Sequence, residues 1–128
     1  MKFKRTFDIL DHVIENYPKE DNFAVKRFGK WDKFSVEEIK RQADLFSYGL
    51  IEMGFKKGDK IATVSNNRPE WNIVDFGMEQ IGVIHVPVYP TIGEIEYTHI
   101  LNHSEAKIMI ISSKERYDYI KPITDKIE

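Results

Sequence analysis

Three short apolar runs, each followed by a helical pattern, dominate the second half of the sequence. The runs are KIATVS from Lys60, GVIHVPVYP from Gly82 and AKIMIIS from Ala106. Helical spacing of apolar residues follows in segments 69–81 and 94–102 and from residue 114 onward. Near-continuous apolar runs are typical of parallel strands covered on both faces, and their crossovers are nearly always right-handed. The order therefore predicts an α/β fold with a partial doubly wound parallel sheet, βαβαβα.

The first half of the chain predicts a helix and then a β-hairpin. Apolar residues keep helical spacing across residues 6–17, and Pro18 closes that segment. Apolar and polar residues then alternate on either side of Gly29, which predicts a hairpin with Gly29 and Lys30 in its turn.

A long amphipathic helix is the strongest helical signal in the chain. Ser35 is placed to cap its start, with Glu38 three residues later in capping-box spacing. Apolar residues recur at helical spacing up to Met53, and Gly54 is placed to end the helix. In the later strands, Pro87 and Pro90 are expected to end the second apolar run.

Composition excludes several classes of function. The formal net charge is −2, from 19 basic and 21 acidic side chains, so no broad basic surface for nucleic acid is expected. The chain has no cysteine, which excludes disulfides, thiolate catalysis and cysteine metal sites. No apolar run approaches the ~20 residues that a transmembrane helix needs. We expect a soluble, cytoplasmic protein with a packed core.

The turn SNNRPEW follows the first apolar run and begins a helix, a junction that holds phosphates in many α/β proteins. It has no glycine that would let a phosphate approach the backbone closely. Asn67 and Glu70 have capping-box spacing, with Pro69 in the first helical turn. Since a proline disfavours helical geometry in the preceding residue, Arg68 is an alternative cap. We interpret Asn67 and Glu70 as structural capping residues.

Three histidines are candidates for a chemical role. His99 and His103 lie four residues apart on a predicted helix, a spacing that can hold zinc, but no further ligand is evident and we predict no metal site. His85 lies inside an apolar strand, where a hydrogen-bonded structural role is the better interpretation. No catalytic or cofactor-binding residue is predicted in this chain.

Tyr89 and Thr91 lie just beyond the carboxyl end of a predicted central strand, where ligands bind in open α/β sheets. They are the candidates for residues near a substrate channel. The competing interpretation is that the prolines stop the strand and Thr91 caps the next helix.

Several stretches resemble the N-terminal region of long-chain fatty acyl-CoA synthetases, which are AMP-forming, adenylate-forming ligases. They are GDKIA, NNRPEW, GVIHVPVYPT and YTHILNHSEAKIMII, preceded by WDKFSVEEIKRQADLFSYGL. The resemblance implies that residues 1–128 form the N-terminal part of the large AMP-binding domain, with the rest of that domain and a C-terminal lid absent.

The resemblance also implies a two-step reaction for a larger parent enzyme. A fatty acid carboxylate attacks ATP to give an acyl-adenylate and pyrophosphate, and the thiol of coenzyme A then displaces AMP. ATP, Mg²⁺ and coenzyme A are the implied cofactors. The family's Ser/Thr/Gly-rich phosphate loop, adenine motif and catalytic lysine match no residue here, so this chain alone is expected to be inactive.

Two further properties follow from the resemblance, and two alternatives stay open. Lipid substrates imply peripheral contact with a membrane, and self-association of long-chain members implies a homodimer. One alternative is an adenylate-forming ligase of another substrate class. The other is a stand-alone flavodoxin-like module such as a phosphoacceptor receiver domain, although its first parallel strand would end in Ser65 and Asn66, without a carboxylate.

Overall fold

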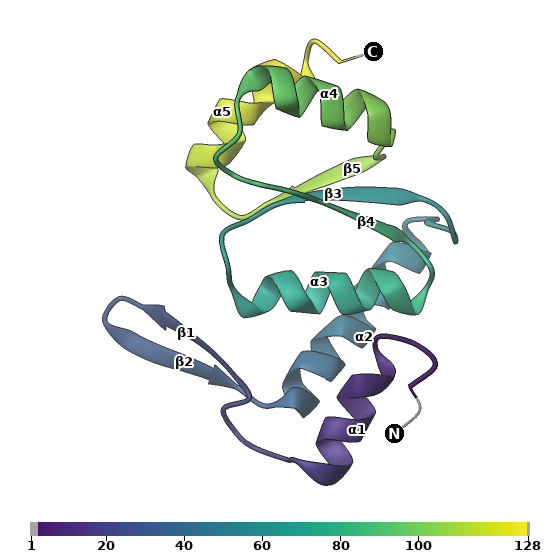
Figure 1. The fold of residues 1–128 in the computed structure, drawn as a ribbon, viewed down its shortest axis with the longest axis vertical. Coiled ribbons are helices and arrows are strands. Elements are labelled where there is room, and N and C mark those ends of the chain that lie inside the picture. Colours follow the sequence, from purple (N-terminus) through teal and green to yellow (C-terminus); the bar gives the residue numbers. More distant parts are fainter. Residues whose placement is uncertain (1–2, 128) are drawn as a thin grey trace. The chain divides into compact units, whose positions relative to one another are not determined.

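The computed structural model describes residues 3–127, which contain five helices and five strands. These residues fall into two compact units. The first unit comprises the residues up to Lys56 together with Asn67–Gly82, and the second comprises Lys57–Asn66 and the residues from Val83 onward. Each unit is shown in Figure 1.

The first unit confirms the predicted order of helix, hairpin and long helix. It contains α1 (Asp8–Asn16), β1 (Phe23–Arg27), β2 (Lys30–Phe34), α2 (Val36–Glu52) and α3 (Pro69–Gln80). The strands β1 and β2 form an antiparallel hairpin that extends from the helices of this unit (Figure 1). One buried cluster of the unit consists of Leu10, Val36, Ile39 and Ile73, against which Phe23 and Phe34 from the hairpin pack.

The hairpin turn lies one residue earlier than the sequence predicts. Arg27 pairs with Lys30, so the two turn residues are Phe28 and Gly29, and the placement of Lys30 in the turn was wrong. Both turn residues have positive φ, 48° for Phe28 and 80° for Gly29. A turn with two positive φ angles matches the right-handed twist of the strands, and Gly29 takes its second position without steric cost.

The ends of α2 are those that the sequence predicts. The side chain of Ser35 accepts a hydrogen bond of 3.2 Å from the backbone N–H of Glu38. At the other end Gly54 has φ 86°, and the N–H of Phe55 donates to the carbonyl of Leu50. This left-handed glycine satisfies carbonyls that the helix end would otherwise leave without partners.

The helices α2 and α3 approach closely at Gly77. A Cβ atom added there would lie 2.7 Å from Cδ1 of Phe46 and 2.9 Å from the carbonyl oxygen of Ala43. Only glycine fits this position without a shift of the neighbouring helix. The close approach explains why α3 has a small residue in the middle of its buried face.

The second unit contains the predicted parallel sheet. Its strands are β3 (Lys60–Val64), β4 (Ile84–Val88) and β5 (Ile108–Ile111), in the order β4–β3–β5. The chain passes from β3 to β4 on one side and then to β5 on the other, which is the reversal of a doubly wound fold. The helices α4 (Glu94–Ser104) and α5 (Lys114–Thr124) lie together on one face of the sheet (Figure 1).

A single apolar cluster fills the space between this sheet and its two helices. It is built from Ala62, Val64, Val88, Tyr97, Leu101, Ile120 and Ile123. The strand β4 continues through Pro87, which lies opposite Thr63, so the prediction that Pro87 ends the strand was wrong. Within the described sheet β4 is an edge strand, and an edge strand tolerates a residue that lacks a backbone donor.

Candidate functional site at the carboxyl edge of the parallel sheet

The carboxyl ends of the three parallel strands bring polar residues to one edge of the second unit. Val64 at the end of β3 is in register with Val88 of β4 and Ile111 of β5. The N–H of Ser112 donates to the carbonyl of Val64 over 3.0 Å. Ligands bind at this edge in open α/β sheets, so it is the candidate site.

Tyr89 follows β4 directly at this edge. The residue is 79% exposed, whereas its carbonyl oxygen accepts a 3.2 Å hydrogen bond from the hydroxyl of Tyr97. Tyr97 is fully buried, and burial raises the pKa of its hydroxyl further above neutral pH. The buried tyrosine fixes the backbone of Tyr89 and leaves its ring free to meet a ligand.

Thr91 is also exposed, in the turn that leads to α4. It does not cap that helix, because the residue in the N-cap position is Gly93. The competing interpretation of Thr91 as a helix cap was therefore wrong. The structure brings Tyr89 and Thr91 to the same turn, and whether they meet a substrate stays a prediction.

The Asn67 cap predicted for α3 does not form as expected. The N-cap position is Arg68, whose extended backbone (φ −164°, ψ 154°) is the geometry that a following proline favours. Asn67 lies one residue before that position, and the cap predicted for it was wrong.

Glu70 holds the start of α3 through ion pairs in the first unit. Its carboxylate accepts two hydrogen bonds from Arg68, of 3.0 and 3.1 Å, and pairs with Arg27 of the hairpin. Partial burial opposes its ionisation, but the hydrogen bonds from Arg68 and Arg27 outweigh it and lower the pKa of Glu70 to about 2. Glu70 is thus a charged link between α3 and β1.

The structure shows the surroundings of the three histidines that the sequence singles out. Nε2 of His85 lies 2.7 Å from Oγ1 of Thr63, which confirms a hydrogen-bonded histidine in the sheet. The rings of His99 and His103 are stacked, with centroids 5.8 Å apart. Among residues 3–127, no group of three or more metal-binding side chains is found.

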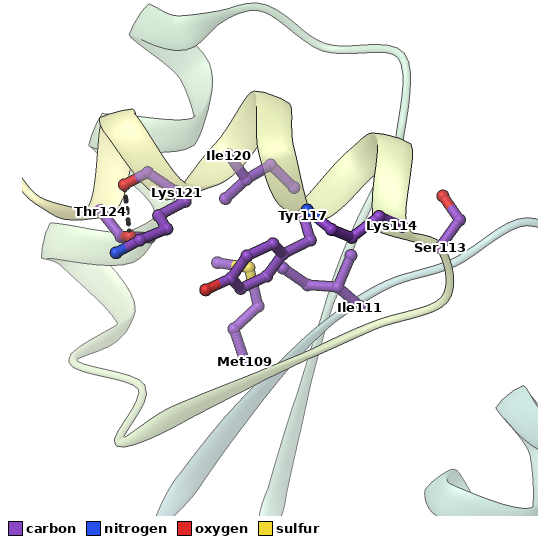
Figure 2. A pocket seen from close by; sticks show the side chains of 8 residues that line it. All are labelled: Met109, Ile111, Ser113, Lys114, Tyr117, Ile120, Lys121 and Thr124. Carbon is purple, nitrogen blue, oxygen red and sulfur yellow. Dashed lines mark hydrogen bonds between the residues drawn. The ribbon is translucent and has the colours of Figure 1, made fainter.

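A hollow between β5 and α5 was not predicted from the sequence. It has a volume of about 630 Å³, with an apolar floor from Met109, Ile111 and Ile120. Figure 2 shows side chains of β5 and α5 facing one another across it. Polar groups of Ser113, Lys114, Tyr117, Lys121 and Thr124 complete its lining. The spacing of apolar residues in α5 predicts a buried face but not the gap beside it.

The residues of this edge do not fit a triphosphate or its metal ion. The turn after β3 has no glycine between Ser65 and Trp71, so a phosphate could not approach the backbone closely. Ser113 begins α5, but its side chain accepts from the N–H of Arg116 and is committed to that cap. The edge supplies hydroxyls and an exposed aromatic ring rather than a phosphate cradle.

The family model for AMP-binding enzymes matches residues 10–127. The chain belongs to the AMP-binding enzyme family. Fatty acyl-CoA synthetase A of Dictyostelium discoideum is 27% identical over 117 residues, which cover 86% of this chain and 18% of that protein. Crotonobetaine/carnitine–CoA ligase of Escherichia coli is 37% identical over 78 residues, 61% of this chain and 14% of that protein.

A solved structure supports the fold assignment of this AMP-binding chain. The anthranilate CoA ligase AuaEII, in complex with anthranoyl-AMP, matches 98% of this chain and 24% of its own, with a TM-score of 0.75 and 18% identity. This AMP-binding chain thus spans less than a fifth of the length of the two curated relatives described above. None of the helices in the described part of the chain is long and apolar enough to cross a bilayer.

Proposed function

We propose that residues 1–128 form the N-terminal part of the large AMP-binding domain of a long-chain fatty acyl-CoA synthetase. The observation that supports this proposal most is the family match over residues 10–127. The similarity to a protein named fatty acyl-CoA synthetase A favours fatty acids as substrates. The whole protein would join a fatty acid to coenzyme A through an acyl-adenylate, with ATP as energy source and Mg²⁺ as its counter-ion.

In this proposal the present chain supplies scaffold and no catalytic group. Its carboxyl edge lacks a phosphate cradle, so ATP would be held by residues elsewhere in the whole protein. Tyr89 and Thr91, exposed in one turn at that edge, would line the approach to the substrate channel. They would contact the acyl chain rather than the reacting carboxylate.

The test of the reaction uses the whole protein. Fatty-acid-dependent release of pyrophosphate from ATP, followed by formation of acyl-CoA, is the expected result. Release that responds to carnitine-type or aromatic acids but not to fatty acids would instead favour an adenylate-forming ligase of another substrate class. Absence of any acid-dependent pyrophosphate release would overturn the assignment as a ligase.

The role of the turn is tested separately in the same assay. Tyr89→Ala and Thr91→Val should raise the KM for the fatty acid and leave the KM for ATP unchanged. Tyr48→Ala is the control, because Tyr48 is an exposed tyrosine on α2 in the first unit. Equal effects of the three variants on both substrates would contradict a place for the turn in the channel.

We also infer that the whole protein is cytoplasmic, contacts membranes at their surface and forms a homodimer. The homodimer rests on the resemblance to long-chain fatty acyl-CoA synthetases, whose self-association implies it. Light scattering after size exclusion should give twice the monomer mass over a range of concentrations. A constant monomer mass would rule the dimer out.

A further inference from the structure

The outward face of the hairpin combines an aromatic ring with lysines. Strand pairing places Lys26 directly opposite Trp31, with Ala24 opposite Lys33 on the same face. All four residues are exposed, whereas the alternate residues of β1 are partly buried. This outward face therefore carries positive charge and one large ring, with no acidic residue.

The tip of the hairpin adds a second aromatic residue. Phe28 is fully exposed and has φ 48°, in the left-handed region that bulky residues rarely occupy. The left-handed backbone opposes folding, the exposed ring gains nothing from it, and asparagine would suit this turn better. The stability of the fold therefore does not explain a phenylalanine at this position, whereas a role in binding does.

The charge of the hairpin differs from that of the whole chain. Segment 26–33 has four basic residues and one acidic residue, a charge of +3, whereas the chain has a net charge of −2. The single acidic residue, Asp32, pairs with Arg27 on the opposite face of the hairpin. Lys33 also pairs with Asp21 over 3.2 Å. Lys26, opposite Trp31, and Lys30, next to Trp31 in the sequence, take part in neither of these ion pairs and leave positive charge beside the rings.

We propose that this hairpin binds the surface of an anionic phospholipid membrane. Phe28 and Trp31 enter the interface between headgroups and acyl chains, where aromatic rings partition favourably. Lys26 and Lys33 on the outward face contribute a screened attraction to the lipid phosphates, and Lys30 adds to it from beside the turn. With one hairpin and few lysines, binding is weak and reversible.

The membrane surface is favoured over other partners on specific grounds. One ring at the turn tip and a second on the adjoining strand suit the shallow entry that an interface allows, whereas a nucleic acid would require a longer basic surface than +3 provides. This inference assigns to the hairpin the membrane contact inferred above for the whole protein, and it does not depend on the ligase reaction. Its test measures lipid binding without any substrate, so it can fail while the ligase assignment stands.

Fluorescence of Trp31 provides the direct test. The chain has two tryptophans, so Trp71→Phe leaves Trp31 as its only tryptophan, whose emission is excited selectively at wavelengths that tyrosine does not absorb. Vesicles of phosphatidylcholine containing phosphatidylserine should shift its emission to the blue, and added salt should reverse the shift. Vesicles of phosphatidylcholine alone should leave it unchanged. An unchanged spectrum with anionic vesicles overturns the proposal.

Two further variants, each made in the Trp71→Phe chain, distinguish an effect on membrane binding from an effect on folding. Phe28→Asn suits the turn better and should retain the fold, yet it should weaken partition into anionic vesicles roughly tenfold. Lys26→Gln should weaken it about fivefold. Ile95→Ser is the control, because Ile95 is 83% exposed on α4, and it should bind as the parent does.

Other outcomes identify a different partner. An equal loss of vesicle binding in Phe28→Asn and Ile95→Ser would indicate unspecific apolar adsorption and overturn the proposal. A blue shift that grows with protein concentration without vesicles would assign the hairpin to self-association. A shift produced by a single-stranded RNA oligonucleotide but not by vesicles would assign it to nucleic acid.

Discussion

The hydroxyl oxygen of Ser47 on α2 lies 2.7 Å from the carbonyl oxygen of Gly77 on α3. It also lies 3.0 Å from the carbonyl oxygen of Ala43, one turn earlier in its own helix. Ser47 is buried, and a buried hydroxyl needs a partner. The bond therefore joins the two helices where the missing side chain of Gly77 lets them come closest.

Gly77→Ala should destabilise the first unit by about 1–3 kcal/mol, the usual cost of overpacking a close contact. The added methyl group would meet the backbone oxygen of Ala43 at 2.9 Å, and a backbone atom cannot rotate away. Chemical denaturation monitored by circular dichroism measures the change in the free energy of unfolding.

Gly49→Ala is the matched control on the facing helix. A Cβ atom added there meets nothing within 4 Å, so the change should raise the free energy of unfolding by about 0.5–1 kcal/mol. Opposite signs at the two glycines are the expected result. Stabilisation by both substitutions would contradict the close approach of α2 and α3.

The stability of the first unit should depend on pH through Glu70. The pKa of its carboxyl falls from an ordinary value of 4.5 to about 2 in the folded chain. The folded state therefore binds fewer protons, so the stabilisation is complete above pH 4.5 and is lost as the pH falls toward 2. Glu70→Gln should be less stable than the parent at neutral pH, and the difference should shrink in acid.

The control for Glu70→Gln is a glutamate in an equivalent helical position that lacks these ion pairs. Glu37 lies exposed in the first turn of α2, as Glu70 lies in the first turn of α3. Unfolding free energies of Glu37→Gln and Glu70→Gln are measured across the acidic range. A difference between Glu70→Gln and the parent that stays constant with pH would show that the ion pairs with Arg27 and Arg68 do not stabilise the fold.

Much of the fold could be predicted because its signals are local. Apolar spacing located the long helix α2, and the Ser35 cap and Gly54 end are set by residues within one turn of each helix end. The parallel sheet followed from apolar runs separated by helical patterns. The reversed strand order β4–β3–β5 agrees with the predicted doubly wound topology.

The parts that could not be predicted depend mostly on residues distant in the chain. Arg27 pairs with Glu70 across 43 positions, so no local pattern relates them. The prediction of the hairpin turn was off by one residue. The twist of the paired strands determines which two residues form the turn, and the turn propensity of a single residue does not reveal this. The hollow beside β5 results from how α5 lies on the sheet, which spacing alone does not specify.

Phe28→Asn should raise the free energy of unfolding by about 1 kcal/mol, because asparagine tolerates the left-handed backbone that costs phenylalanine about that much. Asn-Gly is also the preferred pair for a turn in which both residues have positive φ. Phe28→Val is the opposing variant, since a branched side chain at φ 48° is more strained. Thermal unfolding should rank Asn above Phe and Phe above Val; the reverse order would contradict the turn geometry.

Tyr97→Phe should lower the free energy of unfolding of the second unit by about 1 kcal/mol, the usual net contribution of one hydrogen bond. The change removes the hydroxyl that donates to the carbonyl of Tyr89 and leaves that oxygen without this donor. Hydrogen exchange of the turn after β4 should speed up as well, because the bond holds its backbone.

Tyr119→Phe is the control for this loss. The ring centroids of Tyr119 and Tyr97 lie 6.2 Å apart, and Tyr119 is nearly half exposed. Removing its hydroxyl should therefore cost little stability. The control should leave both the unfolding free energy and the exchange rates near Tyr89 unchanged. If Tyr97→Phe destabilises the unit without faster exchange at Tyr89, the buried hydroxyl supports the core but does not hold the turn at the candidate site.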